Sequence, residues 1–195
     1  MINIPSIALS ANFTFHPEPL IIFISAVAVI SIINIVLTST SFRIIKSAMA
    51  AGDNKKVIFH GRMLHRKYSN YAKRKSASPS TRTLLEYLNI TLAVAYYSEN
   101  DMENFLSHIN SLETFLNLKY FWLGIYHLNK NEFEEADEIC KKIELGIETE
   151  KERIFLDSLK LYRQNNKDAA KEKITPIYDE LKSPVLRKIT DEIMK

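Results

Sequence analysis

The most prominent pattern in the chain is a long uncharged stretch near its N-terminus. No charged residue occurs from Pro19 to Phe42, and the residues from Leu20 to Leu37 are apolar almost throughout. The eighteen residues of the apolar part, at about 1.5 Å per residue of α-helix, span roughly 27 Å, close to the thickness of the hydrocarbon core of a bilayer. The pattern therefore predicts a transmembrane helix over residues 19–42.

After residue 83 the apolar positions follow the period of α-helices, about 3.6 residues, and nothing favours strands. Four positions place a capping Thr or Asn three residues before a Glu, which predicts helix N-termini at Thr83, Asn100, Asn131 and Thr149. Ser183 followed by Pro184 predicts the start of a final helix. The expected helices cover residues 84–97, 101–114, 117–129, 132–145, 151–164, 167–181 and 184–194. The connections are short, so we expect an all-α domain of antiparallel neighbours over residues 84–195.

The uncharged stretch differs from a cleaved signal sequence in two respects. No Lys or Arg precedes it, and no small-residue cleavage pattern follows Leu37, after which Thr-Ser-Thr-Ser-Phe leads to Arg43. We therefore expect a retained anchor. Within it, Asn34 is the polar residue expected to contact a partner transmembrane helix.

Charge divides the chain into three zones. Residues 1–18 carry only Glu18, residues 43–83 carry eleven Lys or Arg against the single acid Asp53, and residues 84–195 carry 15 Lys or Arg against 21 acids. By the positive-inside rule, the N-terminal tail is predicted outside and everything after the anchor in the cytoplasm. The richness in Ile, Asn and Lys is typical of AT-rich, mostly bacterial genomes, which favours a bacterial inner or plasma membrane.

Residues 43–83 form a basic neck between the anchor and the acidic domain. Their apolar residues have rough helical spacing and alternate with cations, as in helices that lie on anionic lipid. The cations expected at the membrane surface are Arg43, Lys46, Lys55, Lys56, Arg62, Arg66, Lys67, Lys73, Arg74 and Lys75. Two other interpretations stay open. A turn-like segment at residues 50–57 indicates a degenerate hairpin of the following domain, and cations interleaved with tyrosines would also suit a nucleic acid or a ribosome.

Turn sequences in the acidic domain repeat with nearly constant spacing. Asn131–Ala136 and Asn165–Ala170 begin 34 residues apart, and Asn100–Phe105 begins 31 residues before the first. A period of 34 residues built from helix–turn–helix units is typical of tetratricopeptide repeats. The chain resembles this family over about 100 residues. The positions that match its packing residues are Tyr120, Leu123, Gly124 and Ala136 in the repeat 117–150, with Ala170 in the next repeat.

The resemblance implies a short solenoid of stacked hairpins with a C-terminal capping helix. Its concave groove would be formed by the first helix of each hairpin and would bind another protein. By the family's pattern, the groove residues are Tyr87, Ile90, Val94, Tyr97, Phe121, Ile125, Asn129, Phe155, Leu159, Tyr162 and Arg163. Their aromatic and apolar content suits a partner helix or a hydrophobic peptide. The expected function is a membrane-anchored adaptor or scaffold, similar in layout to repeat proteins of envelope biogenesis, secretion or membrane protein quality control.

Motifs that would indicate an enzyme or a cofactor site do not occur in the sequence. It contains no glycine-rich phosphate loop, no His-Glu-x-x-His and no Gly-x-Ser-x-Gly. The single cysteine, Cys140, excludes an internal disulfide and a cysteine-based zinc site. His60 and His65 do not share a helix face, and His108 and His127 have no obvious acidic companion, so these histidines are interpreted as structural. We expect no catalytic activity, cofactor or metal.

Two other classes of function stay open. The protein would be a small dedicated subunit or an immunity-type inhibitor of a membrane complex if its transmembrane helix, with Asn34, made the decisive contact. It would be a membrane-tethered ribosome or nucleic-acid binder if the basic neck carried the activity. If residues 84–195 without the anchor still bind the same partner as the full chain, the adaptor is favoured. If removal of the anchor abolishes binding of every partner, the subunit is favoured.

Overall fold

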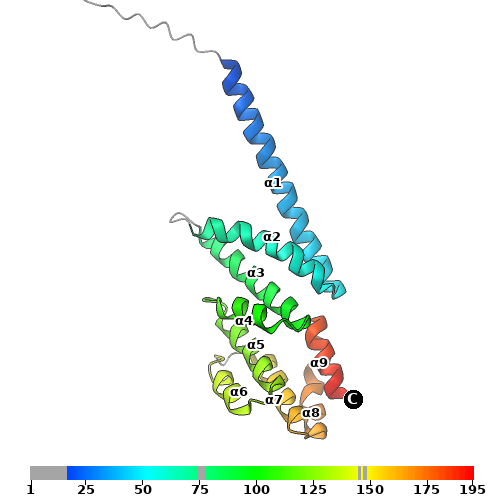
Figure 1. Cartoon of the computed structure of the whole chain (residues 1–195). Helices are drawn as coiled ribbons and strands as arrows, with labels where there is room; N and C mark the ends of the chain where they lie inside the picture. Colours follow the sequence, from blue (N-terminus) through cyan, green and yellow to red (C-terminus); the bar gives the residue numbers. More distant parts are fainter. Residues whose placement is uncertain (1–16, 74–77, 145, 147–148) are drawn as a thin grey trace, which may run out of the picture. The chain divides into compact units, whose positions relative to one another are not determined.

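The computed structural model describes residues 17–73, 78–144, 146 and 149–195, with side chains from Val27 onward. These residues form nine α-helices and the 3₁₀ helix η2, and the described part contains no β-strand (Figure 1). The expectation of an all-α fold is therefore confirmed. The chain divides into two units, with the boundary between Ser39 and Thr40.

Helix α1 (Pro17–Ala51) contains the uncharged stretch. Its large apolar side chains from Val27 to Leu37 are between 47% and 67% exposed, whereas a core helix of a soluble protein buries such residues. Over Val27–Ala51 the helix is long and apolar enough to cross a membrane, and no other described helix is. An exposed apolar helix near the N-terminus fits both a membrane anchor and a signal sequence.

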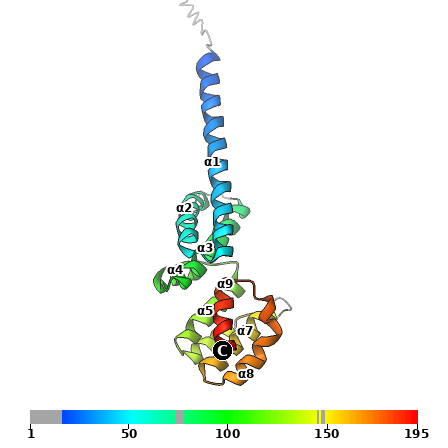
Figure 2. The same ribbon diagram turned by 90° about the vertical axis from the view of Figure 1, so that its right-hand side faces the viewer.

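The second unit is a series of helices that pack mainly on their neighbours in the chain as hairpins. After the last part of α1, its helices are α2 (Asn54–Ala72), α3 (Pro79–Ser98), α4 (Met102–Asn110), α5 (Leu116–Asn129), α6 (Phe133–Cys140), α7 (Glu150–Arg163), α8 (Lys167–Ile174), η2 (Thr175–Glu180) and α9 (Pro184–Met194). The expected helices are all present, but α4, α6 and α8 are only eight or nine residues long. Helix α9 packs on α7 and α8 at the end of the series (Figure 2).

The same tight turn follows the first helix of four successive hairpins. Its central residue is Gly52, Asn100, Asn131 or Asn165, each with φ between 60° and 69°. In every case the next residue donates its backbone N–H to a carbonyl five residues earlier, over 2.9 or 3.0 Å. This is the hydrogen bond of a Schellman motif, in which Gly or Asn is preferred because other residues are strained at positive φ. One local geometry therefore repeats along the second unit.

The turn geometry corrects the prediction that Asn100 and Asn131 cap the N-termini of the following helices. Both residues instead adopt the left-handed conformation and close the preceding helix. The N-cap moves one residue along the chain: Asp101 accepts a hydrogen bond from the Asn104 N–H. In the third helix the cap is Ser78, well before the expected Thr83. Asn serves both as an N-cap and as a left-handed C′ residue, so the spacing to a Glu alone did not distinguish the two.

Two apolar clusters hold the second unit together, and α3 contributes to both. The larger cluster runs from α3 to α9 and contains Leu92, Phe121, Phe155 and Ile193. The smaller one joins the end of α1 to α2 and α3 through residues that include Ile45, Val57, Leu64 and Leu88. The backbone of α2 comes close to α3 at a glycine, Gly61, where an added Cβ would lie 2.8 Å from Leu92 Cδ2.

A buried carboxylate connects α3 to the start of α5. Glu86 accepts hydrogen bonds from the backbone N–H groups of Glu113, Thr114 and Phe115, at 3.4, 2.9 and 3.2 Å, and from the Thr114 hydroxyl. Burial alone would raise the pKa of Glu86, but these hydrogen bonds outweigh it and lower the pKa below its ordinary value. The ionised side chain thus satisfies backbone donors at the N-terminus of α5.

Candidate functional site

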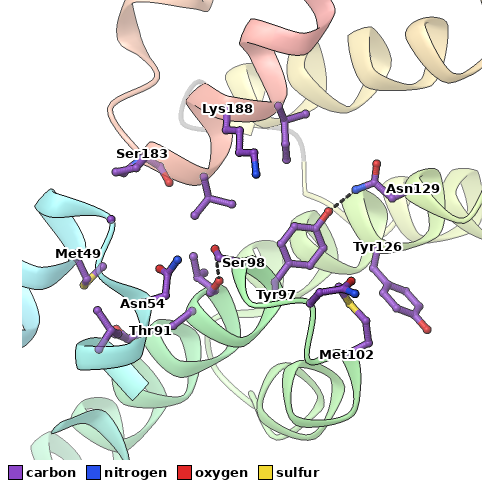
Figure 3. Close-up of a pocket in the computed structure, with 18 of the residues that line it drawn as sticks. Met49, Asn54, Thr91, Tyr97, Ser98, Met102, Tyr126, Asn129, Ser183 and Lys188 are labelled. Atoms are coloured by element: carbon purple, nitrogen blue, oxygen red, sulfur yellow. Dashed lines mark hydrogen bonds between the residues drawn. The ribbon is translucent and has the colours of Figure 1, made fainter. Parts of the chain in front are cut away.

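A groove of about 900 Å³ lies in the second unit (Figure 3). Its floor is formed by α3 and by the C-terminal ends of α5 and α7, one wall by the turn between α1 and α2, and the opposite wall by α9. Pockets of this volume are typical of ligand sites. We refer to this feature as the α3–α9 groove.

Three polar side chains form a hydrogen-bonded row along the floor of the α3–α9 groove. The Asn129 amide donates to the Tyr97 hydroxyl, and the Arg163 guanidinium donates to the Asn129 carbonyl oxygen. The three residues come from α3, α5 and α7 and stand two or three positions before the repeated left-handed turns. The repetition of the turn therefore aligns them.

The row combines a neutral phenol with a cation that has an unused donor. Burial raises the pKa of Tyr97, so its phenol stays protonated at neutral pH. Arg163 uses one terminal nitrogen on Asn129, and its buried Nε has no hydrogen-bond partner among the described residues. A guanidinium prefers to satisfy its donors with a planar anion such as a carboxylate.

Charge in the α3–α9 groove is opposite in sign to that of the surrounding domain. Four cations line it, namely Lys130, Arg163, Lys182 and Lys188, against the single acid Glu192. Residues 84–195 as a whole carry six more acids than bases. Figure 3 shows the Lys188 side chain pointing from α9 into the groove, toward Tyr97. The arrangement concentrates positive potential in one concave site.

Apolar side chains accompany the cations. Met49, Val94, Met102, Val185 and Ile189 line the groove from α1, α3, α4 and α9. Methionine side chains are flexible and adapt to partners of different shape. The site therefore offers both apolar contact and anion recognition to one ligand.

Side chains on its outer face hold α9 in place as a wall of the groove. The Arg187 guanidinium lies 3.7 Å from the centre of the Tyr178 ring and donates to the Tyr178 carbonyl over 2.7 Å. The Tyr178 hydroxyl in turn donates to Asp191 over 2.9 Å. On the inner face, Thr190 and Ile193 are completely buried. Together these contacts place Lys188 and Ile189 opposite α3.

Four of the residues predicted for a groove line it: Val94, Tyr97, Asn129 and Arg163. Four others are buried in the large apolar cluster, which corrects the prediction for Phe121, Ile125, Phe155 and Leu159. The physical reason is that α5 packs on α7 while η2 and α9 cover α7, so these faces are closed by protein. Of the rest, Tyr87 is exposed away from the groove, and Ile90 and Tyr162 pack at the edge of the cluster.

Many of the residues that sequence reasoning missed come from the ends of the unit, from α1 and from α9 with the connection before it, and Met102 of α4 and Lys130 at the end of α5 were missed as well. Lys188 and Ile189 were assigned to a capping helix and Lys182 to the connection before it, none of them to a site, although the Ser183-Pro184 pair correctly marked where that helix begins. A capping helix that folds back over the first helices leaves no local signal in the sequence. The only available sign was the placement of Lys188 on the same helix face as Val185 and Ile189.

The predicted repeat-packing residues lie inside the unit. Ala136 and Ala170 are buried, and a Cβ on Gly124 would lie 3.1 Å from a methyl of Leu156 and 3.6 Å from the Cys140 sulfur. Tyr120 and Leu123 are half-buried against the large cluster. Burial raises the pKa of the half-buried Cys140 to about 11, so it remains a thiol.

The predicted membrane-surface cations lie on the last part of α1 and on α2, except for Arg74 and Lys75, which are outside the described residues. Arg43, Lys46 and Lys67 belong to the second unit, as do Lys55, Lys56, Arg62, Arg66 and Lys73. Asn34 lies on the exposed part of α1, where its backbone carbonyl accepts a hydrogen bond from the Thr38 hydroxyl.

A second polar cluster joins α2, α3 and α4 around two histidines. The His65 and His108 rings meet edge to face at 5.1 Å, and His108 also stacks on Tyr96. His108 Nδ1 lies 2.9 Å from the side-chain amide oxygen of Asn89. This oxygen can only accept a hydrogen bond, so Nδ1 carries the proton of the neutral ring. Burial, together with the neighbouring His65, lowers the pKa of His108 to about 4. At neutral pH the pair is therefore uncharged.

One histidine prediction requires correction. His127 does have an acidic companion, because its Nδ1 lies 2.7 Å from the Glu132 carboxylate. The left-handed turn at Asn131 folds Glu132 back onto the end of α5, which adjacency in the sequence did not reveal. Among the described residues, no three His, Cys, Asp or Glu side chains are placed to hold a metal ion.

No family model matches the chain, and no curated protein or solved structure is significantly similar to it. Any function of the α3–α9 groove must therefore be inferred from the geometry and charge of the groove itself.

Proposed function

We propose that the protein is a single-pass, membrane-anchored adaptor of tetratricopeptide-like architecture whose α3–α9 groove binds an acidic segment of a protein partner. The observation that carries the proposal is the concentration of four cations and the Tyr97–Asn129–Arg163 row in one concave site of an acidic domain. The apolar side chains beside them suit a segment that combines carboxylates with apolar residues.

The anchor and its orientation complete the proposal. The exposed apolar part of α1 supports insertion in a membrane, and the eleven cations of residues 43–83 favour the cytoplasm for the second unit. Four positive-φ turns, three of them at Asn residues spaced by 31 and 34, support the tetratricopeptide-like description. The groove would then recruit a cytoplasmic protein to the membrane, with no catalytic step.

Photo-crosslinking in native membranes tests this function. A crosslinking amino acid is placed at Ser98 in the groove, at Asn34 in the apolar helix, or at Glu172 on the exposed side of α8, and the products are identified by mass spectrometry. We expect one dominant protein product from Ser98 and none of that protein from Glu172. A partner crosslinked only from Asn34 would overturn the adaptor and favour a subunit that acts through its transmembrane helix.

Charge removal in the groove provides the matched comparison. Lys182→Gln combined with Lys188→Gln neutralises two exposed groove cations, and we expect the Ser98 product to fall by at least about tenfold. Lys141→Gln combined with Lys171→Gln removes the same charge outside the α3–α9 groove and should leave the product unchanged. Equal loss in both variants would show that net charge matters and that the groove does not.

In the same membranes, protease added to the cytoplasmic side alone should digest residues 84–195.

A further inference from the structure

Helix α2 has one face that packs on the second unit and one that does not. Its buried face carries Val57, Gly61 and Leu64, which meet α3 and the end of α1. The exposed residues recur at helical spacing on the opposite side. They are Lys55, Lys56, Phe59, Arg62, Met63, Arg66, Asn70 and Tyr71, continued by Lys73 at the C-cap. We call this set the outer face of α2.

The composition of the outer face is unusual for a surface in contact with water alone. Phe59 is 63% exposed and Met63 is 54% exposed, and no acidic residue lies among the exposed positions. Large apolar side chains between cations are typical of helices that lie in the interface of an anionic membrane, where the rings enter the acyl boundary and the cations stay among the phosphates.

The fold also brings the end of α2 to the residue where the uncharged stretch ends. The turn at Gly52 reverses the chain, and α2 then lies at an angle to the last part of α1 and packs on it through side chains such as Ile45 and Val57 (Figure 1). As a result the rings of Phe42 and Tyr68 lie 6.3 Å apart, and the Tyr68 and Tyr71 rings lie 6.4 Å apart. Phe42 is the last residue before the first cation, Arg43. Aromatic rings and cations at such a boundary are typical of the membrane–water interface.

We propose that the outer face of α2 docks on the anionic leaflet of the membrane that holds α1. The inference rests on the anchor of the proposed function and adds a second, peripheral contact with lipid. The ligand is the phosphate-rich surface of the bilayer, bound by Lys55, Arg62 and Arg66, with Phe59 and Met63 inserted below the phosphates. Residues 84–195 are acidic overall, so attraction to the same leaflet is expected at the outer face of α2 and not over the rest of the unit as a whole.

Lysine footprinting of the full-length protein tests the docking. The protein is reconstituted in nanodiscs of phosphatidylcholine alone or of an equimolar mixture with phosphatidylglycerol, and acetylation rates of individual lysines are measured by mass spectrometry. We expect Lys55, Lys56 and Lys73 to react at least about threefold more slowly in the anionic discs, and raised salt to reverse the effect. Lys141, Lys182 and Lys188 should react at equal rates in both.

A pair of variants separates the face from total charge. Arg62→Gln with Arg66→Gln, both exposed on the outer face, should abolish the protection of Lys55 and Lys73. Lys141→Gln with Lys171→Gln should preserve it. Protection that persists in the first variant would overturn the proposal.

The remaining outcomes distinguish this inference from the proposed function. A protein that does not insert even in neutral discs has no anchor, and both proposals fail. A protein that inserts but shows equal lysine reactivity in the two kinds of disc retains the anchor and refutes the docking. Protection of the same lysines by bulk tRNA in neutral discs, with none by phosphatidylglycerol, would refute the lipid and assign the outer face to nucleic acid.

Discussion

Replacing Phe155 with alanine is expected to destabilise the second unit by about 3–5 kcal/mol, a large part of the free energy of unfolding of a typical domain. Phe155 is completely buried in α7, and its ring meets that of Phe121 edge to face at 5.6 Å. The substitution removes this contact and leaves a cavity that η2 and α9 cannot readily close. A smaller effect would indicate that Phe155 faces the groove, as the family pattern predicted.

The single tryptophan reports this effect directly. Trp122 is buried and lies 5.8 Å from the Phe121 ring, so its fluorescence follows unfolding of the large cluster during a urea titration of the full-length protein in detergent. Tyr87→Ala serves as the control, because Tyr87 is 48% exposed and its loss should change the stability by less than about 0.5 kcal/mol. A loss below about 1 kcal/mol for Phe155→Ala, together with loss of the partner, would restore the original assignment.

Replacing Glu86 with glutamine is expected to destabilise the fold by about 2–3 kcal/mol. The carboxylate accepts from three backbone N–H groups and one hydroxyl at the start of α5, whereas an amide offers one oxygen and turns an N–H toward those donors. At least one buried donor is then left without a partner. Urea titration with Trp122 fluorescence measures the loss.

The pH dependence follows from the lowered pKa of Glu86. Because the pKa is lower in the folded than in the unfolded chain, the carboxylate contributes its full stability above its ordinary value of 4.5, and that contribution is lost as the pH falls through the folded pKa. In Glu86→Gln this part of the acid sensitivity should disappear, so the two proteins converge in stability at low pH.

Glu172→Gln is the matched control, since Glu172 is exposed in α8. We expect it to leave both the stability at neutral pH and its decline in acid unchanged within about 0.5 kcal/mol. If Glu86→Gln matched this control, the hydrogen bonds of the carboxylate to the start of α5 would not contribute to the stability.

The helices were predictable because their signals are local. Apolar spacing placed each helix of residues 84–195, and Ser183 with Pro184 marked the start of α9. Asn100 and Asn131 marked the right turns for the wrong reason, since both close a helix and do not open one. The ambiguity is chemical, because the short Asn side chain suits an N-cap and its backbone tolerates positive φ.

The candidate site was less predictable because it depends on contacts between distant segments. Tyr97, Asn129 and Arg163 were expected in a groove from the family resemblance, but the hydrogen bonds that join them were not predicted. Lys182 and Lys188 were not predicted, because Lys188 lies on α9 and Lys182 in the connection before it. Helix α9 is held beside the groove by contacts between distant residues, such as Arg187 with Tyr178, and by the burial of Ile193.

Patterns within one or two helical turns established the all-α class, the positions of the helices, the apolar helix near the N-terminus and the change from a basic to an acidic segment. Such patterns can be recognised without knowing which segments pack together, because side-chain spacing and charge are local properties of the sequence. Whether Phe121 and Phe155 face a ligand or each other, and which side of α2 is left exposed, depended on which helix faces meet. Packing resolves those choices, since each face of a short helical array is either buried by a neighbour distant in the chain or left to bind something else.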